Sequence, residues 1–157
     1  MLNTFPFTEL TLEVSFQPVG LGRDQTLVGE DGQPTSAPEA PLQLGLRADN
    51  RLEIAVIDRG GTVRRVASRQ PVTDTRWQHV VATIAGDALT LWMNSGAGWE
   101  HEGRVPCPGG LVLHDGTWTV GRGFHAGKLA RDAQALIDEV QISTRGLGRE
   151  EWLWSTP

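Results

Sequence analysis

The chain has 157 residues, and its 14 basic and 19 acidic side chains give a net charge of −5. This length suits one domain over residues 1–157 with a two-layer core. The negative balance argues against nucleic acid and against an anionic membrane surface as partners, since both favour a clustered basic patch. Membrane insertion is not expected, because no window reaches the roughly 18 consecutive apolar residues that a membrane helix needs.

The first strand is predicted over Leu10 to Gln17, where apolar and polar residues alternate as in a half-buried antiparallel strand. A short run of residues, Gln25 to Val28, follows this strand. Gly29 to Pro41 is then too rich in Gly and Pro for regular structure, and its length is typical of a functional or disordered loop.

Further strands are predicted from alternation, β propensity and intervening turn residues. They are Leu42 to Arg47, Arg51 to Ile57, Val63 to Ser68, Thr75 to Ile84, Ala88 to Asn94, Trp99 to Val105, Trp118 to Val120 and Ala135 to Ser143. Arg149 to Leu153 is the one short helical turn expected. Because no helical pattern reaches about 12 residues, βαβ folds are excluded, and an antiparallel sandwich, barrel or jelly roll remains.

The strand Ala135 to Ser143 places Leu136, Asp138, Val140 and Ile142 on one face. We therefore expect Asp138 on the apolar side of the strand. An unpaired buried carboxylate is costly, so it requires a hydrogen-bond donor, a cation or the end of the sheet.

Several stretches together resemble one family. Leu10 to Pro18 resembles the opening strand of concanavalin A-like lectin/glucanase domains. Trp77 to Ala82 and Asp87 to Asn94 resemble two consecutive strands of laminin G-like jelly-roll domains. The order is completed by Val120-Gly121-Arg122, by Ile137 to Ser143 and by Leu147-x-x-Glu150. The resemblance implies an all-β fold, an antiparallel two-sheet β-sandwich of the concanavalin A-like jelly-roll type.

The resemblance also implies a structural calcium ion beside Asp138. Ca²⁺ takes six to eight oxygen ligands, and Glu30 and Asp31, in a loop flanked by glycines, are candidates to add oxygens. The alternative is that Asp138 caps backbone N–H groups or pairs with an arginine such as Arg145. An extracellular or cell-surface location is likewise implied, although no signal peptide is visible at the N-terminus of this chain.

Sugar binding needs an aromatic face for the C–H surface of the ring and a few polar groups for its hydroxyls. Trp92, in phase with Thr90 and Asn94, and Trp99, after a glycine-rich turn, are the candidate exposed platforms. Asn94 is the candidate polar group beside them. Trp77 and Trp118 are expected in the core, and Trp152 is expected to close the sandwich.

Catalysis is not expected. A glycosidase needs two carboxylates about 5 to 9 Å apart across the sugar, whereas Asp138 and Glu139 are adjacent and point to opposite faces of one strand. Glu100 and Glu102, with His101 between them, suit a solvated hairpin better. The lone Cys107 has no partner for a disulfide or a metal site within the chain.

The sequence and the family resemblance therefore favour a non-catalytic binding module with a glycan or protein ligand, and carbohydrate (lectin-like) recognition is the leading hypothesis. We expect it to be an accessory domain of a larger exported protein. The alternative is a structural or protein-interaction domain without sugar affinity. A glycoside hydrolase is the least favoured hypothesis. The ligand and the oligomeric state are not predicted.

Overall fold

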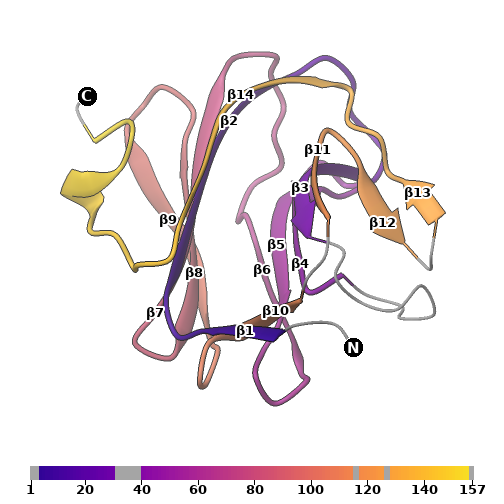
Figure 1. Ribbon diagram of the computed structural model, residues 1–157. Helices are drawn as coiled ribbons and strands as arrows, with labels where there is room; N and C mark the ends of the chain where they lie inside the picture. Colours follow the sequence, from indigo (N-terminus) through magenta and orange to yellow (C-terminus); the bar gives the residue numbers. More distant parts are fainter. Residues whose placement is uncertain (1–3, 31–39, 115–116, 126–127, 156–157) are drawn as a thin grey trace.

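Two five-stranded antiparallel sheets face each other in the computed structural model, which describes residues 4–30, 40–114, 117–125 and 128–155 (Figure 1). The first sheet has the order β14-β2-β7-β8-β9, and the second has the order β11-β3-β4-β5-β6. The expected all-β, two-sheet antiparallel sandwich is confirmed.

The elements follow in chain order. The first sheet is built from β2 (Leu10–Pro18), β7 (Gln78–Ala85), β8 (Ala88–Asn94), β9 (Trp99–Pro106) and β14 (Ala135–Ser143). The second sheet is built from β3 (Gln25–Glu30), β4 (Leu42–Leu46), β5 (Leu52–Ile57), β6 (Val63–Ala67) and β11 (Trp118–Val120). Two short pairs join β1 (Thr4–Phe7) to β10 (Leu111–His114) and β12 (Gly123–His125) to β13 (Lys128–Ala130). One 3₁₀ turn, η1 (Arg149–Glu151), follows β14, so the predicted helical turn is confirmed. In the described part of the chain, no helix has the length and apolar character that crossing a membrane requires.

The core lies between the sheets and follows the alternation of the strands. Leu12, Val14 and Phe16 of β2 are fully buried, and the alternate aliphatic residues of β4, β5 and β7 meet them from both sheets. Burial of such side chains is the main favourable term in folding, worth about 1.5–3 kcal/mol for each one. The strand positions read from period-two patterning in these segments are therefore confirmed.

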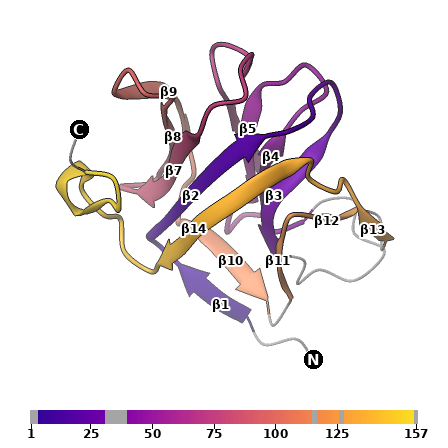
Figure 2. The same cartoon turned by 90° about the horizontal axis from the view of Figure 1, so that it is seen from above.

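β14 is an edge strand that lies beside β2 (Figure 2), and its exposure differs from the expectation. Asp138 is exposed, and the side chain of Leu136 is 55% exposed. The reason is register: these two residues stand opposite Ser15 and Gln17, on the outer face of the sheet, while Ile137 packs towards the core opposite Phe16. A bulge between Asp138 and Gln141 then shifts the register. The prediction that Asp138 lies on a buried apolar face is wrong.

Residues 144–155, here called the C-terminal segment, cover the outer face of the first sheet (Figure 1). The Thr11 hydroxyl donates to the Arg145 carbonyl and accepts from the Leu147 N–H, at 2.7 Å and 2.9 Å. The Leu153 N–H donates to Glu13 Oε2 at 2.7 Å. These contacts explain why two polar residues of β2, Thr11 and Glu13, are fully buried.

Three tryptophans differ from expectation. Trp77 and Trp118 are 39% and 38% exposed rather than in the core. Trp118 lies on the short edge strand β11, which leaves it covered on one side only. Trp152 is buried, but it packs against Val81 on the outer face of the first sheet and does not close the sandwich.

Candidate binding site

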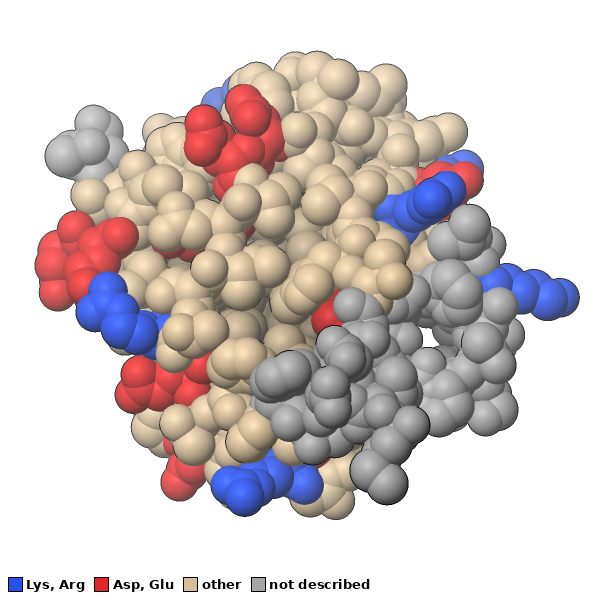
Figure 3. Space-filling model, in the orientation of Figure 1, with Lys and Arg blue, Asp and Glu red and all other residues tan. Residues whose placement is uncertain are grey.

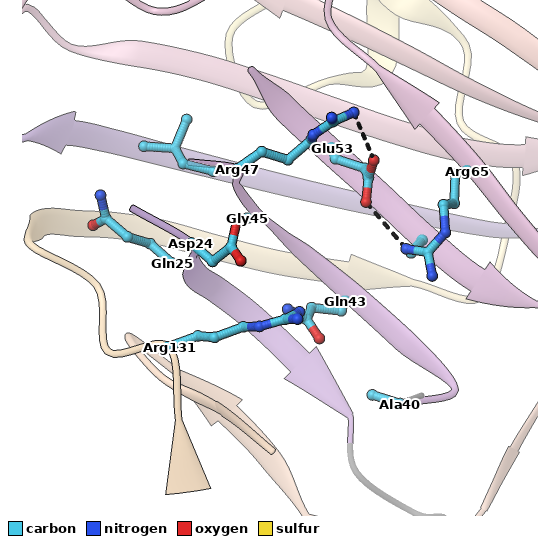
Figure 4. Close-up of a pocket in the computed structure, with 11 residues that line it drawn as sticks. Asp24, Gln25, Ala40, Gln43, Gly45, Arg47, Glu53, Arg65 and Arg131 are labelled. Carbon is cyan, nitrogen blue, oxygen red and sulfur yellow. Dashed lines mark hydrogen bonds and ion pairs between the residues drawn. The ribbon is translucent and has the colours of Figure 1, made fainter. Parts of the chain in front are cut away.

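A hollow of about 350 Å³ lies on the outer face of the second sheet (Figure 4). Its floor is made by β4 and β5, where Gln43 stands opposite Ala55 and Gly45 opposite Glu53. The small side chain of Ala55 and the absence of one at Gly45 leave space between the longer polar side chains. Gly45 is required on steric grounds as well, because a Cβ there would collide with the carbonyl oxygen of Gln25 on β3.

Glu53 orders two arginines at the hollow. Its Oε1 lies 3.1 Å from Arg65 Nη1, and its Oε2 lies 3.5 Å from Arg47 Nη1. Glu53 is the least exposed of the three side chains, at 19%, whereas the arginines are 43% and 47% exposed. The carboxylate therefore holds both guanidinium groups at the hollow, and Arg47 Nη2 also lies 3.4 Å from Asp49 Oδ2.

Arg131 enters the hollow from the opposite side, between β13 and β14, and extends towards Gln43 (Figure 4). Its carbonyl oxygen accepts from the Thr26 N–H at 2.7 Å, and its backbone has a φ of +57°. Such a conformation is uncommon for a residue other than glycine. Among the described residues, no carboxylate forms an ion pair with Arg131, although Asp24 also lines the hollow.

The remaining polar groups are already ordered. Gln43 Nε2 donates to the Thr26 hydroxyl at 2.9 Å, and Asp24 Oδ1 accepts from the Ala48 N–H at 2.9 Å. No aromatic residue belongs to the described lining. The hollow thus presents planar guanidinium, amide and carboxylate groups, which are suited to paired hydrogen bonds with neighbouring hydroxyls or with an acid group.

The tryptophans predicted to bind ligand lie on the other side of the sandwich. Trp92 and Trp99 are half-buried and both contact Trp152, at ring-centroid distances of 5.7 Å and 4.9 Å. The Trp99 indole N–H donates to the Trp154 carbonyl at 3.0 Å. The Asn94 side chain accepts from the N–H groups of Gly96 and Gly98, so it caps the turn after β8.

The family model of the concanavalin A-like lectin/glucanases superfamily matches residues 2–151. The chain belongs to the concanavalin A-like lectin/glucanase superfamily. This match agrees with the resemblance read from the strand motifs, and it covers both sheets of the sandwich. A comparison with curated proteins finds no match.

Several solved structures are similar in fold to this chain. The chain is similar to the CBM40 of the Ruminococcus gnavus IT-sialidase bound to α2,3 sialyllactose, with 12% identity, a TM-score of 0.72, and coverage of 93% of this chain and 80% of that one. A heptameric SAP-like pentraxin from Limulus polyphemus has 13% identity, a TM-score of 0.64, and coverage of 93% and 69%. A putative carbohydrate binding protein from Bacteroides ovatus has 18% identity, a TM-score of 0.64, and coverage of 94% and 42%. At these identities the similarity shows the fold.

The residues predicted to hold Ca²⁺ are not brought together in the described structure. Asp138 is exposed on β14 of the first sheet, where its Oδ1 accepts from the Glu139 N–H at 2.9 Å. Glu30 is buried on β3 of the second sheet, and Asp31 lies outside the described residues. No group of three His, Cys, Asp or Glu side chains suited to a metal occurs among the described residues. The described donor set does not fit calcium, and the calcium site stays a prediction.

The carboxylates weighed for catalysis have a structural partner. The backbone N–H of Arg69 donates to Glu102 Oε2 at 2.7 Å, and its guanidinium lies 3.8 Å from both Glu100 and Glu102. On the face shown in Figure 3, the acidic and basic side chains form small separate groups.

The hollow is not predictable from local sequence. Its residues come from five separate segments, and no local motif joins them. The sequence does indicate which residues face outwards. Gln43, Glu53 and Arg65 are polar residues that alternate with buried aliphatic residues in their strands, so each is expected on the outer face of the sheet.

Proposed function

We propose that the chain is a non-catalytic carbohydrate-binding module that binds an acidic glycan in the hollow on the second sheet. The observation that carries the proposal is Arg131, a guanidinium in a hollow of polar groups with no ion-pair partner among the described residues. A carboxylate on a sugar supplies that partner, because an arginine and a carboxylate form two parallel hydrogen bonds.

The neighbouring groups suit the rest of such a ligand. Gln43 and the two arginines fixed by Glu53 offer donors and acceptors for ring hydroxyls. The fold also supports binding of an acidic glycan, since a similar structure is a CBM40 bound to sialyllactose, which is an acidic trisaccharide. An extracellular location and a role as an accessory domain of a larger exported protein belong to this proposal, and they rest on the family.

The test is isothermal titration with 3′-sialyllactose and with lactose, which lacks the acid group. We expect binding of sialyllactose only, and we expect Arg131→Gln to weaken it about tenfold or more, since charged hydrogen bonds are worth about 1.5–3 kcal/mol. Arg59→Gln, at an exposed arginine in the turn after β5, is the matched control and should bind like the wild type. Equal binding of lactose, or unchanged binding by Arg131→Gln, contradicts the assignment of this hollow.

A protein-interaction domain without sugar affinity is the second candidate, and the exposed aliphatic side chains of β14 favour it. Leu136, Val140 and Ile142 are 55%, 36% and 40% exposed, and exposed aliphatic side chains along an unpaired sheet edge are suited to association. If this function is correct, the protein should bind no glycan on a glycan array. Its molar mass in light scattering should rise with protein concentration, and the Leu136→Lys variant should show no such rise.

A further inference from the structure

A second hollow, of about 400 Å³, lies on the outer face of the first sheet, on the opposite side of the sandwich from the first. Thr83 of β7, Thr90 of β8 and Arg104 of β9 stand side by side across three strands and form its floor. Trp92 lines it next to them, and the C-terminal segment adds Trp152 and Arg149.

The charges of this hollow have one sign. Arg104 and Arg149 line it, and no described carboxylate does. Neither arginine has an ion pair with a described acidic residue, whereas Arg64, Arg76 and Arg145 are each paired. Two guanidinium groups facing one hollow without a counter-charge repel each other, and a bound anion removes that repulsion.

The hollow also has an aromatic face. The guanidinium carbon of Arg149 lies over the Trp92 ring, 5.7 Å from its centre, so the charge is held against the indole at the edge of the hollow. Thr83 and Thr90 add hydroxyl-bearing side chains, and His101 and Leu147 also line the hollow. This lining complements a ligand that has an apolar ring face, hydroxyls and an anionic group. One sugar residue that carries an acid group has all three features.

We infer that this second hollow is a separate binding site for an acidic saccharide, held by Arg104 and Arg149 and bordered by Trp92. It does not depend on the first hollow, because the two lie on different sheets and share no residue. With both sites occupied, one molecule cross-links two glycan chains, and tethered binding of this kind strengthens attachment without any new contact.

Tryptophan fluorescence distinguishes the two sites, because Trp92 and Trp152 line the second hollow and no tryptophan is in the described lining of the first. The probes are tetragalacturonate for carboxylated sugars, a heparin tetrasaccharide for sulfated sugars, and maltotetraose as the neutral control. We expect a saturable fluorescence change with one or both anionic probes and none with maltotetraose. The responding probe identifies the acid group.

The variant Arg104→Gln/Arg149→Gln should lower the affinity for the responding probe about tenfold or more. Both side chains are exposed, so the fold should be retained, and circular dichroism checks this. Arg131→Gln should leave the fluorescence titration unchanged. An unchanged titration of the double variant, a loss of the signal in Arg131→Gln, a response to maltotetraose, or no response to any probe overturns the second site. None of these outcomes bears on the binding of sialyllactose at the first hollow, which the isothermal titration tests independently.

Discussion

The indole of Trp154 lies on the imidazole of His79, with 4.6 Å between the ring centroids and 27° between the planes. His79 Nδ1 is also 2.6 Å from the Ser15 hydroxyl oxygen. The C-terminal segment is therefore joined to the outer face of the first sheet through a titratable ring, and burial lowers the pKa of His79.

We expect this contact to weaken in mild acid. A histidine whose pKa is lowered by folding contributes stability that is complete above its ordinary pKa of 6.5 and is lost as the pH falls towards the folded-state pKa. The melting temperature should therefore fall between about pH 7.5 and about pH 5.5. His79→Phe keeps a ring under Trp154 and does not titrate, so its melting temperature should fall less. An equal fall in both proteins argues against a role for His79.

Glu13 should act in the opposite direction. Burial raises the pKa of its carboxyl, against the lowering effect of the Leu153 N–H bond, and no described group hydrogen-bonds to its Oε1. Its ionised form is therefore disfavoured in the folded state. The contribution of Glu13 to stability should increase as the pH falls through its raised pKa, and it should be complete below its ordinary pKa of 4.5.

Glu13→Gln tests this sign, because the amide oxygen still accepts from the Leu153 N–H while the group no longer ionises. The free energy of unfolding of the wild type, relative to the variant, should rise as the pH is lowered from neutral. Urea titrations at several pH values measure the difference, and a constant difference contradicts the prediction.

Asp58 closes the turn between β5 and β6 and should be needed for stability. Its Oδ1 accepts from the Gly60 and Thr62 N–H groups at 2.9 Å and 2.8 Å, and its Oδ2 lies 2.7 Å from Arg64 Nε. Burial alone would raise its pKa, but these hydrogen bonds and the Arg64 charge outweigh burial and lower the pKa.

Asp58→Asn removes the charge, so we expect a loss of about 2 kcal/mol, the value of a hydrogen bond to a charged group. The control is Asp49→Asn in the β4–β5 turn, whose exposed ion pairs should contribute no more than about 0.5 kcal/mol. Urea unfolding at neutral pH compares them. The difference should shrink in acid as the pH falls through the lowered pKa of Asp58, and equal losses in both variants contradict the prediction.

Calcium binding by Asp138, Glu30 and Asp31 can be tested by a thermal melt of chelated protein with and without millimolar Ca²⁺. If these residues hold the ion, the melting temperature should rise by several degrees, because a metal that binds only the folded state stabilises it. Asp138→Asn should remove that rise. No rise in the wild type leaves Asp138 as an exposed carboxylate that accepts from the Glu139 N–H.

Period-two alternation predicted the sandwich because the aliphatic face of each central strand packs into the core, although the other face of β2 is buried as well. Leu10 to Phe16 is an example, since every second residue is in the core. The same pattern was misleading in β14, where Leu136 and Asp138 face outwards: an edge strand next to a bulge buries little, and neither feature is visible in local sequence. The strand β1 was also missed, because it is short and contains Pro6.

The candidate hollow depends on register between distant strands. Glu53 and Arg65 are recognisable as outward-facing residues, but their contact requires β5 and β6 to pair as they do, and Arg131 arrives from another part of the chain. The burial of Glu13 was equally unpredictable, because the segment that covers it is 140 residues further along. Local patterning specifies which way a residue faces, and tertiary structure decides what covers it.

The pairing of β14 with β2 has a consequence for how the protein is made. β2 (Leu10–Pro18) leaves the ribosome well before β14 (Ala135–Ser143), its neighbour on one side. Until β14 is synthesised, β2 has an open edge, and its residues Thr11 and Glu13 lack the C-terminal segment that later covers them. Closing contacts so distant in sequence is slow, and an open strand edge invites pairing with other chains. The nascent domain is therefore vulnerable to aggregation in the interval between the synthesis of β2 and that of β14.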